Sequence, residues 1–292
     1  MKGGRTTSLD SLAMRNDEGS SAVNADRSVR ILIDPLDVRR TDGGFRRSDA
    51  SCLDDGMRLH VDEHGVGPKV CVLVHGMMGS AESWWRVTPE LVEAGYRVLA
   101  LDLPGHGRSD RDRSLTVERA ADSVVETIGE LTTQTPAVAI GHSFGGAVLA
   151  AAAVRLRPQL AVYVDAPFAS RGGYDFAEVA EEYEHDRQQR TEVKLRESRP
   201  HYSERDCEVE ATAAERFDPF TAAAVASAGG GVWEPAAGSI VVRADPSGYV
   251  SDSDAAALHE RGVSVRSIPG AAHSVWYSNF DQFIAALPEV FQ

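Results

Sequence analysis

The sequence predicts an α/β fold, with a mostly parallel central sheet, helices on both of its faces and a helical lid insertion. Three observations support this. Continuous apolar runs of the kind that form buried parallel strands alternate with segments of helical pattern. The alternation stops over residues 166–237, where acidic helical segments dominate, and then resumes. The chain of 292 residues is long enough for one such domain with an insertion.

The strands and helices can be placed in order along the chain. We expect strands at residues 57–61, 69–74, 96–101, 136–140, 160–164, 239–243 and 263–268. We expect helices at residues 81–93, 116–131, 147–156, 253–261 and 280–287. Residues 51–165 and 238–292 would form the core and residues 166–237 the lid. Residues 1–50 mix Ser, Gly, Asp and Arg without a period, which predicts a mostly disordered extension.

An apolar stripe marks the first helix of the expected lid. Phe176, Val179, Ala180 and Tyr183 follow the spacing i, i+3, i+4, i+7 on an otherwise charged segment. The stripe would either face the active edge of the sheet and bind an apolar substrate, or pack against the core. The sequence does not separate these two interpretations.

Composition excludes several classes of function. The formal net charge is −14, which repels nucleic acid and anionic membrane surfaces and favours neutral or cationic substrates. No segment approaches the ~20 apolar residues that span a bilayer, and no signal peptide is evident. Cys52, Cys71 and Cys207 show no metal-binding spacing, so neither a disulfide nor a metal is expected. We therefore expect a cytoplasmic, cofactor-free enzyme that acts on a small molecule.

One motif indicates a nucleophile. Residues 141–146 read Gly-His-Ser-Phe-Gly-Gly, between an apolar run and a helix-forming run. A serine with glycines two positions away on each side, at a strand-to-helix turn, is typical of a nucleophile elbow. Gly141 and Gly145 would relieve collisions in that sharp turn. The context predicts that Ser143 is the nucleophile.

Residues 52–292 resemble the α/β-hydrolase fold superfamily. Besides the elbow, three motifs carry the resemblance, namely His-Gly-Met-Met-Gly at 75–79, Asp-Leu-Pro-Gly-His-Gly-Arg-Ser at 102–109 and Gly-Ala-Ala-His at 270–273. The loop at 102–109 is expected to be structural, with Asp102 and His106 bonding within it. Such motifs are specific for the fold and uninformative about the substrate.

The resemblance implies a serine, an acid and a histidine in that chain order. His273 would take the proton of Ser143, and Asp245, at the end of its strand, would orient His273. The sequence departs here from the common form of the family, because no glycine ends that strand. Asp165 is the alternative acid, since some members place the acid after the preceding strand. A structural role in bonding loop backbone is the other interpretation of Asp165.

The remaining candidates surround the expected reaction centre. The backbone N–H groups of Met77 and Phe144 would stabilise the developing oxyanion. His142 would point away from Ser143 and serve packing. The expected pocket residues, for each of which core packing is an equal explanation, are His75, Trp84, Phe168, Tyr174, Trp233 and Trp276.

These features favour a serine hydrolase that cleaves a carboxylic ester or lactone of moderate size and apolar character through an acyl-enzyme. Epoxide hydrolase and dehalogenase chemistry is disfavoured, because those relatives carry aspartate at the position of Ser143. The same residues would also serve C–C bond hydrolysis, perhydrolysis or a lyase step. A non-catalytic ligand receptor on the same fold is a further alternative.

Overall fold

The computed structural model describes residues 57–292. The expected N-terminal extension at residues 1–50 and Cys52 lie outside the described residues. No helix in the described part is long and apolar enough to cross a bilayer.

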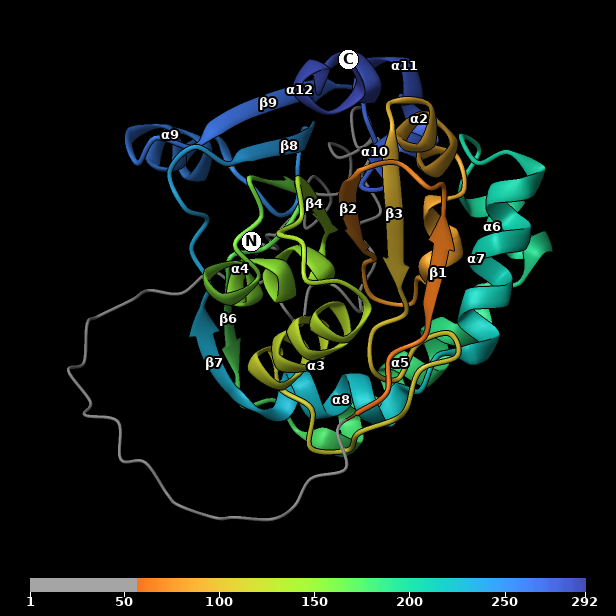
Figure 1. Ribbon diagram of the computed structural model, residues 1–292. Coiled ribbons are helices and arrows are strands. Elements are labelled where there is room, and N and C mark those ends of the chain that lie inside the picture. The colour runs from red at the N-terminus through yellow and green to blue at the C-terminus, as the bar shows by residue number, and fades with distance from the viewer. Residues whose placement is uncertain (1–56) are drawn as a thin grey trace, which may run out of the picture.

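A seven-stranded sheet forms the centre of the described chain (Figure 1). Its strands are β1 (Val61–His64), β2 (Lys69–Val74), β3 (Tyr96–Leu101), β4 (Val138–His142), β5 (Leu160–Val164), β8 (Ile240–Asp245) and β9 (Ser264–Pro269). Their order is β1-β3-β2-β4-β5-β8-β9. Only the β1–β3 pairing in this sheet is antiparallel. The predicted mostly parallel α/β architecture is confirmed.

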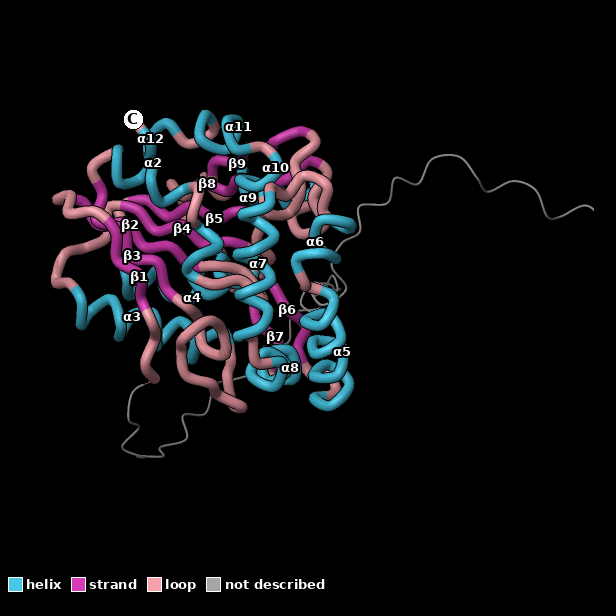
Figure 2. Tube along the Cα trace, turned by 90° about the vertical axis from the view of Figure 1, so that its right-hand side faces the viewer, coloured by secondary structure: helices cyan, strands magenta, loops and turns pink. Residues whose placement is uncertain are grey.

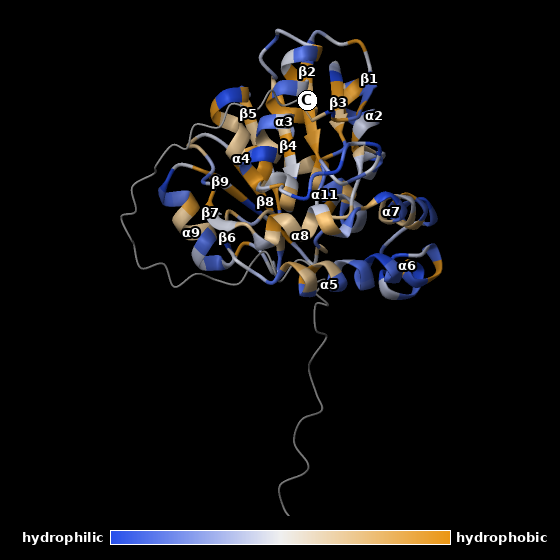
Figure 3. Cartoon of the chain, turned by 90° about the horizontal axis from the view of Figure 1, so that it is seen from below, coloured by the Kyte–Doolittle hydropathy of each residue, from blue (hydrophilic) through white to orange (hydrophobic). Residues whose placement is uncertain are grey.

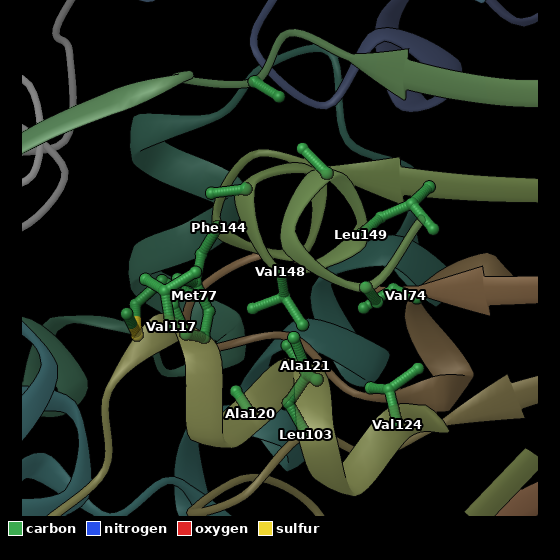
Figure 4. Close-up of a cluster of buried hydrophobic side chains, with 14 of the residues drawn as sticks. Val74, Met77, Leu103, Val117, Ala120, Ala121, Val124, Phe144, Val148 and Leu149 are labelled. Carbon is green, nitrogen blue, oxygen red and sulfur yellow. The ribbon is translucent and has the colours of Figure 1, made fainter. Parts of the chain in front are cut away.

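Helices cover both faces of the sheet and enclose two apolar clusters. One cluster is packed by α3 (Val117–Leu131), α4 (Phe144–Leu156) and α9 (Asp252–Glu260). The other is packed by α2 (Val87–Glu93), α10 (Val275–Ser278), α11 (Phe280–Ala285) and α12 (Pro288–Phe291). Figure 4 shows side chains of α4, among them Val148, pointing toward Ala121 of α3. Apolar burial on both faces explains why the central strands read as unbroken apolar runs.

Several expected elements differ from the observed ones by a few residues at an end, and two differ more. The helix expected at residues 81–93 is split into a 3-10 helix η1 (Ala81–Trp84) and α2. The split places Pro89 in the first turn of α2, where its missing N–H costs no hydrogen bond. The edge strand expected at residues 57–61 begins only at Val61. His60 N donates to Ser109 Oγ (2.8 Å), which itself donates to Asp102 O (2.6 Å), so the hydroxyl takes the place of a direct backbone bond between the strands.

We call residues 166–237, between β5 and β8, the insertion. It contains β6 (Ala169–Gly172), α5 (Phe176–Gln189), α6 (Glu192–Ser198), α7 (Glu204–Arg216), α8 (Pro219–Ser227) and β7 (Gly229–Val232). The insertion lies at the edge of the sheet where the parallel strands end (Figures 1 and 2). Helices α6 and α7 are largely hydrophilic, in contrast to the apolar strands (Figure 3).

The paired strands β6 and β7 were not expected. Residues 229–231 are all glycine and present no apolar pattern from which a strand could be predicted. The pairing itself explains the composition, because an added Cβ at Gly230 would lie 2.1 Å from Arg171 O. The apolar stripe on α5 serves packing: Val179, Ala180 and Tyr183 are buried in the same cluster as α3 and α4.

The strand register gathers the residues that follow the strands. It pairs Val74 with both Leu101 and Gly141, and Val164 with Val242. Four residues that directly follow β2 to β5 therefore lie at one edge of the sheet, namely His75, Asp102, Ser143 and Asp165.

The turn from β4 into α4 requires glycine on both sides of the serine. Ser143 has φ 50° and ψ −122°, a backbone conformation that residues other than glycine rarely adopt. An added Cβ at Gly145 would lie 2.2 Å from His75 O, and one at Gly141 would lie 2.5 Å from Gly145 O. The helix start can approach the end of β2 this closely only because no side chain intervenes.

The loop at residues 102–109 is organised by its first residue. The carboxylate of Asp102 accepts hydrogen bonds from Ala81 N (2.7 Å) and Arg108 N (2.8 Å). An added Cβ at Gly107 would lie 2.1 Å from Asp102 Oδ2. The carboxylate thus connects η1 to the loop after β3, which agrees with a structural role for this motif.

Two buried histidines brace the same loops in their neutral form. His75 Nε2 accepts from Leu103 N (2.9 Å), so the proton resides on Nδ1, which donates to Gly76 O (2.7 Å). Burial lowers the pKa of His75 to about 4. Burial and the nearby charge of protonated His75 lower the pKa of His106 to about 3. Both rings resist protonation because they are out of contact with water.

A methyl group at the elbow should be poorly tolerated. We expect Gly145→Ala to lower the free energy of unfolding by about 3 kcal/mol or more, because its Cβ would overlap backbone atoms that cannot move aside. Gly129→Ala in α3, where an added Cβ meets nothing within 4 Å, should raise stability by roughly 0.5–1 kcal/mol. Urea denaturation of both variants measures the difference, and equal stabilities would contradict the close-approach argument.

Acid should destabilise the protein through the buried histidines. The folded-state pKa values of about 4 and about 3 lie below the unfolded value of 6.5, so only the unfolded chain takes up these protons as the pH falls from 6.5. Their contribution is present above pH 6.5 and is lost toward pH 4. We expect His106→Phe to make the fall in unfolding free energy shallower by roughly 1.4 kcal/mol per pH unit.

Urea denaturation between pH 7 and pH 4 measures that slope. His259→Asn, at an exposed position of α9, is the matched control and should leave the slope as in the wild type. A slope unaltered by His106→Phe would show that other groups govern the acid sensitivity.

Candidate active site

Ser143 lies at the sheet edge, between β4 and the first turn of α4. Its side chain is buried, and its backbone N donates to Val164 O over 3.0 Å, which joins the elbow to the end of β5. The left-handed backbone of Ser143 and the glycines around it fix the direction of the hydroxyl.

His273 follows β9 and is held by three neighbours. Its Nδ1 lies 2.7 Å from Asp165 Oδ2, the Tyr249 ring stacks on its ring at 4.0 Å, and its carbonyl accepts from His142 Nε2 (3.1 Å). Because a carboxylate only accepts hydrogen bonds, Nδ1 of His273 is the donor. In the neutral ring Nε2 therefore keeps its lone pair and can accept a proton.

Asp165 is oriented by the chain that follows β8. It is buried, with only 1% of its surface exposed. Its Oδ1 accepts from Ser247 Oγ (2.6 Å) and from Ala244 N (3.2 Å), which leaves Oδ2 toward His273. A carboxylate fixed in this way holds the imidazole in one tautomer and one orientation.

The expectation that Asp245 orients His273 is corrected by this geometry. The register pairs Val164 with Val242, so Asp165 is level with Arg243, and β8 continues two residues further to Asp245. Asp245 pairs instead with Pro269 of β9, and within residues 57–292 its side chain makes no hydrogen bond to His273. The missing glycine after β8 was the signal of this change, because the strand does not turn early enough to bring its acid to the histidine.

Ser143 and His273 line one cavity of about 30 Å³. No hydrogen bond joins these two side chains, although both lie in the described part of the chain. Catalytic hydrogen bonds are often long without substrate and tighten when it binds. The cavity has room for about two or three water molecules, since one water requires roughly 10–15 Å³ by this measure.

Two backbone N–H groups are suited to an oxyanion. That of Phe144 belongs to the first turn of α4, where no residue of the helix can accept its hydrogen bond, and the helix dipole favours negative charge there. Met77 lines the cavity within a turn closed by the bond from Gly79 N to Gly76 O (3.0 Å). Both groups belong to segments held by the close approach at Gly145.

The cavity is lined by polar side chains, whereas an apolar one was expected. Arg190 and Glu210 of the insertion and Ser83 of η1 face it. No periodic pattern identified these residues, because they lie in segments where charged residues are frequent. The convergence of three segments distant in the sequence could be found only in the structure.

Of the aromatic and histidine residues expected in the pocket, two line the cavity. These are His75 and Trp276. Trp84 does not line the cavity: it stacks against Trp276 at 4.3 Å and is fully buried in the core. The expectation for Trp84 is corrected to core packing.

Phe168, Tyr174 and Trp233 lie away from the cavity. Phe168 packs edge-on against Tyr163 at 5.4 Å, and Tyr174 lies beneath the guanidinium of Arg171 at 4.6 Å. Trp233 donates through Nε1 to Glu118 of α3 (2.8 Å). These aromatic residues hold the insertion and its flanks together, which is the packing explanation.

His142 lines the same cavity as Ser143. Its ring lies 4.8 Å from Trp276 in an edge-on contact, and its Nε2 donates to the carbonyl of His273. Burial and the nearby charge of protonated His273 hold the pKa of His142 well below its usual range. A neutral His142 thus supports the loop that carries His273.

Within the described residues, no group of three or more His, Cys, Asp and Glu side chains could hold a metal ion. Cys71 and Cys207 are both free and buried.

Comparison with known proteins identifies relatives of this arrangement. A bifunctional epoxide hydrolase 2 of Sus scrofa is 39% identical over 97 residues, or 32% of this chain and 17% of the relative. An epoxide hydrolase of Caballeronia sordidicola is 33% identical over 135 residues, or 44% of this chain and 40% of the relative. The chain thus matches less than half the length of these relatives.

An esterase of Exiguobacterium antarcticum has a similar solved structure, with a TM-score of 0.64 and 16% identity. The match covers 82% of this chain and 97% of the esterase, which at this identity shows a shared fold. A family model described as the alpha/beta hydrolase family matches residues 71–286, from β2 to α11. The protein therefore belongs to the alpha/beta hydrolase family.

Proposed function

We propose that the protein is a serine hydrolase that cleaves a carboxylic ester or lactone through an acyl-enzyme. Ser143 is the nucleophile, His273 the general base and Asp165 the acid that orients His273. The observation that carries the proposal is the 2.7 Å contact between His273 Nδ1 and Asp165 Oδ2, beside a cavity that Ser143 also lines.

The first half of the reaction forms the acyl-enzyme. Ser143 Oγ attacks the carbonyl carbon while His273 Nε2 takes its proton, and Asp165 stabilises the imidazolium. The tetrahedral oxyanion accepts hydrogen bonds from the N–H groups of Met77 and Phe144. Collapse of the intermediate breaks the bond to the alcohol oxygen, which leaves with the proton from His273.

The second half restores the enzyme. Water enters the place of the alcohol, His273 takes one of its protons, and the oxygen attacks the acyl carbon. The bond to Ser143 Oγ then breaks, and the proton from His273 returns to the serine. The acid product leaves, and the enzyme regains its starting protonation state.

The insertion acts as a lid in this proposal. A cavity of about 30 Å³ is smaller than common ester substrates, and Arg190 and Glu210 of the insertion form part of its lining. Substrate entry therefore needs movement of the insertion away from the sheet edge, a motion common in enzymes whose sites are covered.

Covalent labelling tests the nucleophile. A fluorophosphonate should label Ser143 of the wild type, and Ser143→Ala should abolish both labelling and hydrolysis of a p-nitrophenyl ester. Mass spectrometry of the labelled peptide locates the adduct. Persistent labelling of the variant at another residue, with turnover retained, would remove Ser143 from the mechanism.

Paired variants test the acid. Asp165→Asn should lower kcat for ester hydrolysis roughly 10²–10⁴-fold, because an amide favours the wrong tautomer of His273. Asp245→Asn, at the end of the neighbouring strand β8, should lower kcat for the same reaction less than about threefold. Steady-state kinetics compares the two, and a greater loss in Asp245→Asn would restore Asp245 as the acid.

A further inference from the structure

A largely buried ion pair in the insertion lines the cavity of the candidate nucleophile. Arg190 caps the C-terminal end of α5, and Glu210 lies on α7. Arg190 Nη1 lies 3.4 Å from Glu210 Oε2, and the two side chains are only 16% and 7% exposed. Both line the cavity with Ser143 and His273.

Glu210 is fixed by the core of the protein. Its Oε1 lies 2.9 Å from the donating Ser83 Oγ and 3.0 Å from the Tyr277 hydroxyl. Burial and the charge of Glu210 raise the pKa of Tyr277 well above its usual range, so this hydroxyl keeps its proton. Two core hydroxyls thus hold one oxygen of Glu210, and the other oxygen faces Arg190.

Removing the charged groups of Arg190 and Glu210 from water costs free energy, which suggests that the charge has a function in the cavity. Removing an ion from water costs several kcal/mol, and apolar residues of similar size often stabilise a protein as well as a buried ion pair does. A lid that only covered an apolar ester would be better served by apolar residues. Placing Arg190 in the cavity that Ser143 also lines makes physical sense when a ligand interacts with the guanidinium.

The chemistry of the pair favours an anionic ligand. Glu210 Oε1 already accepts from two hydroxyls, and Oε2 faces Arg190, whose positive charge opposes a second cation at this place. A guanidinium is planar and carries five N–H donors in a geometry that matches a carboxylate. Glu210 then serves to orient Arg190 in the cavity.

We propose that Arg190 binds a carboxylate of the substrate, so that the preferred substrate is an ester with an acidic group close to the scissile bond. This inference rests on the proposed ester hydrolysis and names its substrate class. The net charge of −14 does not oppose it, because fields of distant exposed charges decay within about 8 Å at physiological salt. Charges inside the cavity decide binding there.

Two esters of similar length test the proposal. Mono-p-nitrophenyl succinate carries a carboxylate on its acyl chain, and p-nitrophenyl butyrate is neutral. We expect Arg190→Gln to lower the ratio of kcat/KM for succinate over butyrate about 10–100-fold, as expected for loss of a charged hydrogen bond. Arg190→Lys keeps the charge without the planar donor set, so its ratio should lie between those of the wild type and Arg190→Gln. This variant replaces Arg190→Gln in the test if Arg190→Gln fails to fold.

Arg187→Gln is the matched control. Arg187 lies three residues earlier on α5 and pairs with Glu184 of the same helix, at 2.6 and 2.8 Å. It does not line the cavity, so the ratio for this variant should equal that of the wild type. An equal fall for both esters in Arg190→Gln would overturn the proposal and assign Arg190 to holding the insertion in place.

A binding measurement separates this proposal from the proposed activity. If the wild type hydrolyses neither ester, ester hydrolysis fails, and calorimetric titration with succinate then decides the role of Arg190. Binding to the wild type that weakens at least tenfold in Arg190→Gln would support the carboxylate site. Equal binding by both proteins, or none by the wild type, would overturn it.

Discussion

Backbone contact between the start of α4 and the end of β2 is the constraint on which the candidate site depends. Gly145 lets the first turn of α4 approach the carbonyl of His75 more closely than any side chain would allow. This approach brings the elbow and the turn at Met77 together. In the proposed reaction, the carbon of one carbonyl group could then meet the Ser143 hydroxyl while its oxygen meets two N–H groups. The strained backbone of Ser143 is tolerated because glycine, strand register and helix packing all support the same turn.

His273 is positioned by a different feature: β8 extends beyond the end of the neighbouring strand β5. Pairing with β8 stops near the end of β5, and the following backbone and Ser247 bind one oxygen of Asp165. The other oxygen faces His273 across the sheet edge. A carboxylate held from one side and presented on the other orients its partner without being exposed to water. Asp245 lacks this arrangement because β8 continues two residues beyond the level of Asp165 before it reaches Asp245.

Elements with a strong local signal were predictable from the sequence. The strands β2, β3 and β5 have the expected bounds, since buried parallel strands read as unbroken apolar runs. The positions of Ser143 and His273 at one edge of the sheet also followed from local motifs. The acid depended on how far β8 extends past β5, and Arg190 and Glu210 reach the cavity only through the three-dimensional path of the insertion. Such relations depend on register and tertiary packing, which short-range patterns do not encode.

Glu210 also connects parts of the chain that would have to separate for a ligand to enter. Its hydrogen bonds reach Ser83, just after the turn at Met77, and Tyr277, four residues beyond His273. In the proposed lid motion these two bonds would break, and the segments on both sides of the candidate reaction centre would lose a common support. The open form that would exchange ligands would therefore differ from the form organised for bond cleavage, and each turnover of the proposed reaction would alternate between the two. The rate at which the hydrogen bonds from Ser83 and Tyr277 to Glu210 re-form would then set an upper limit on the rate of the proposed reaction.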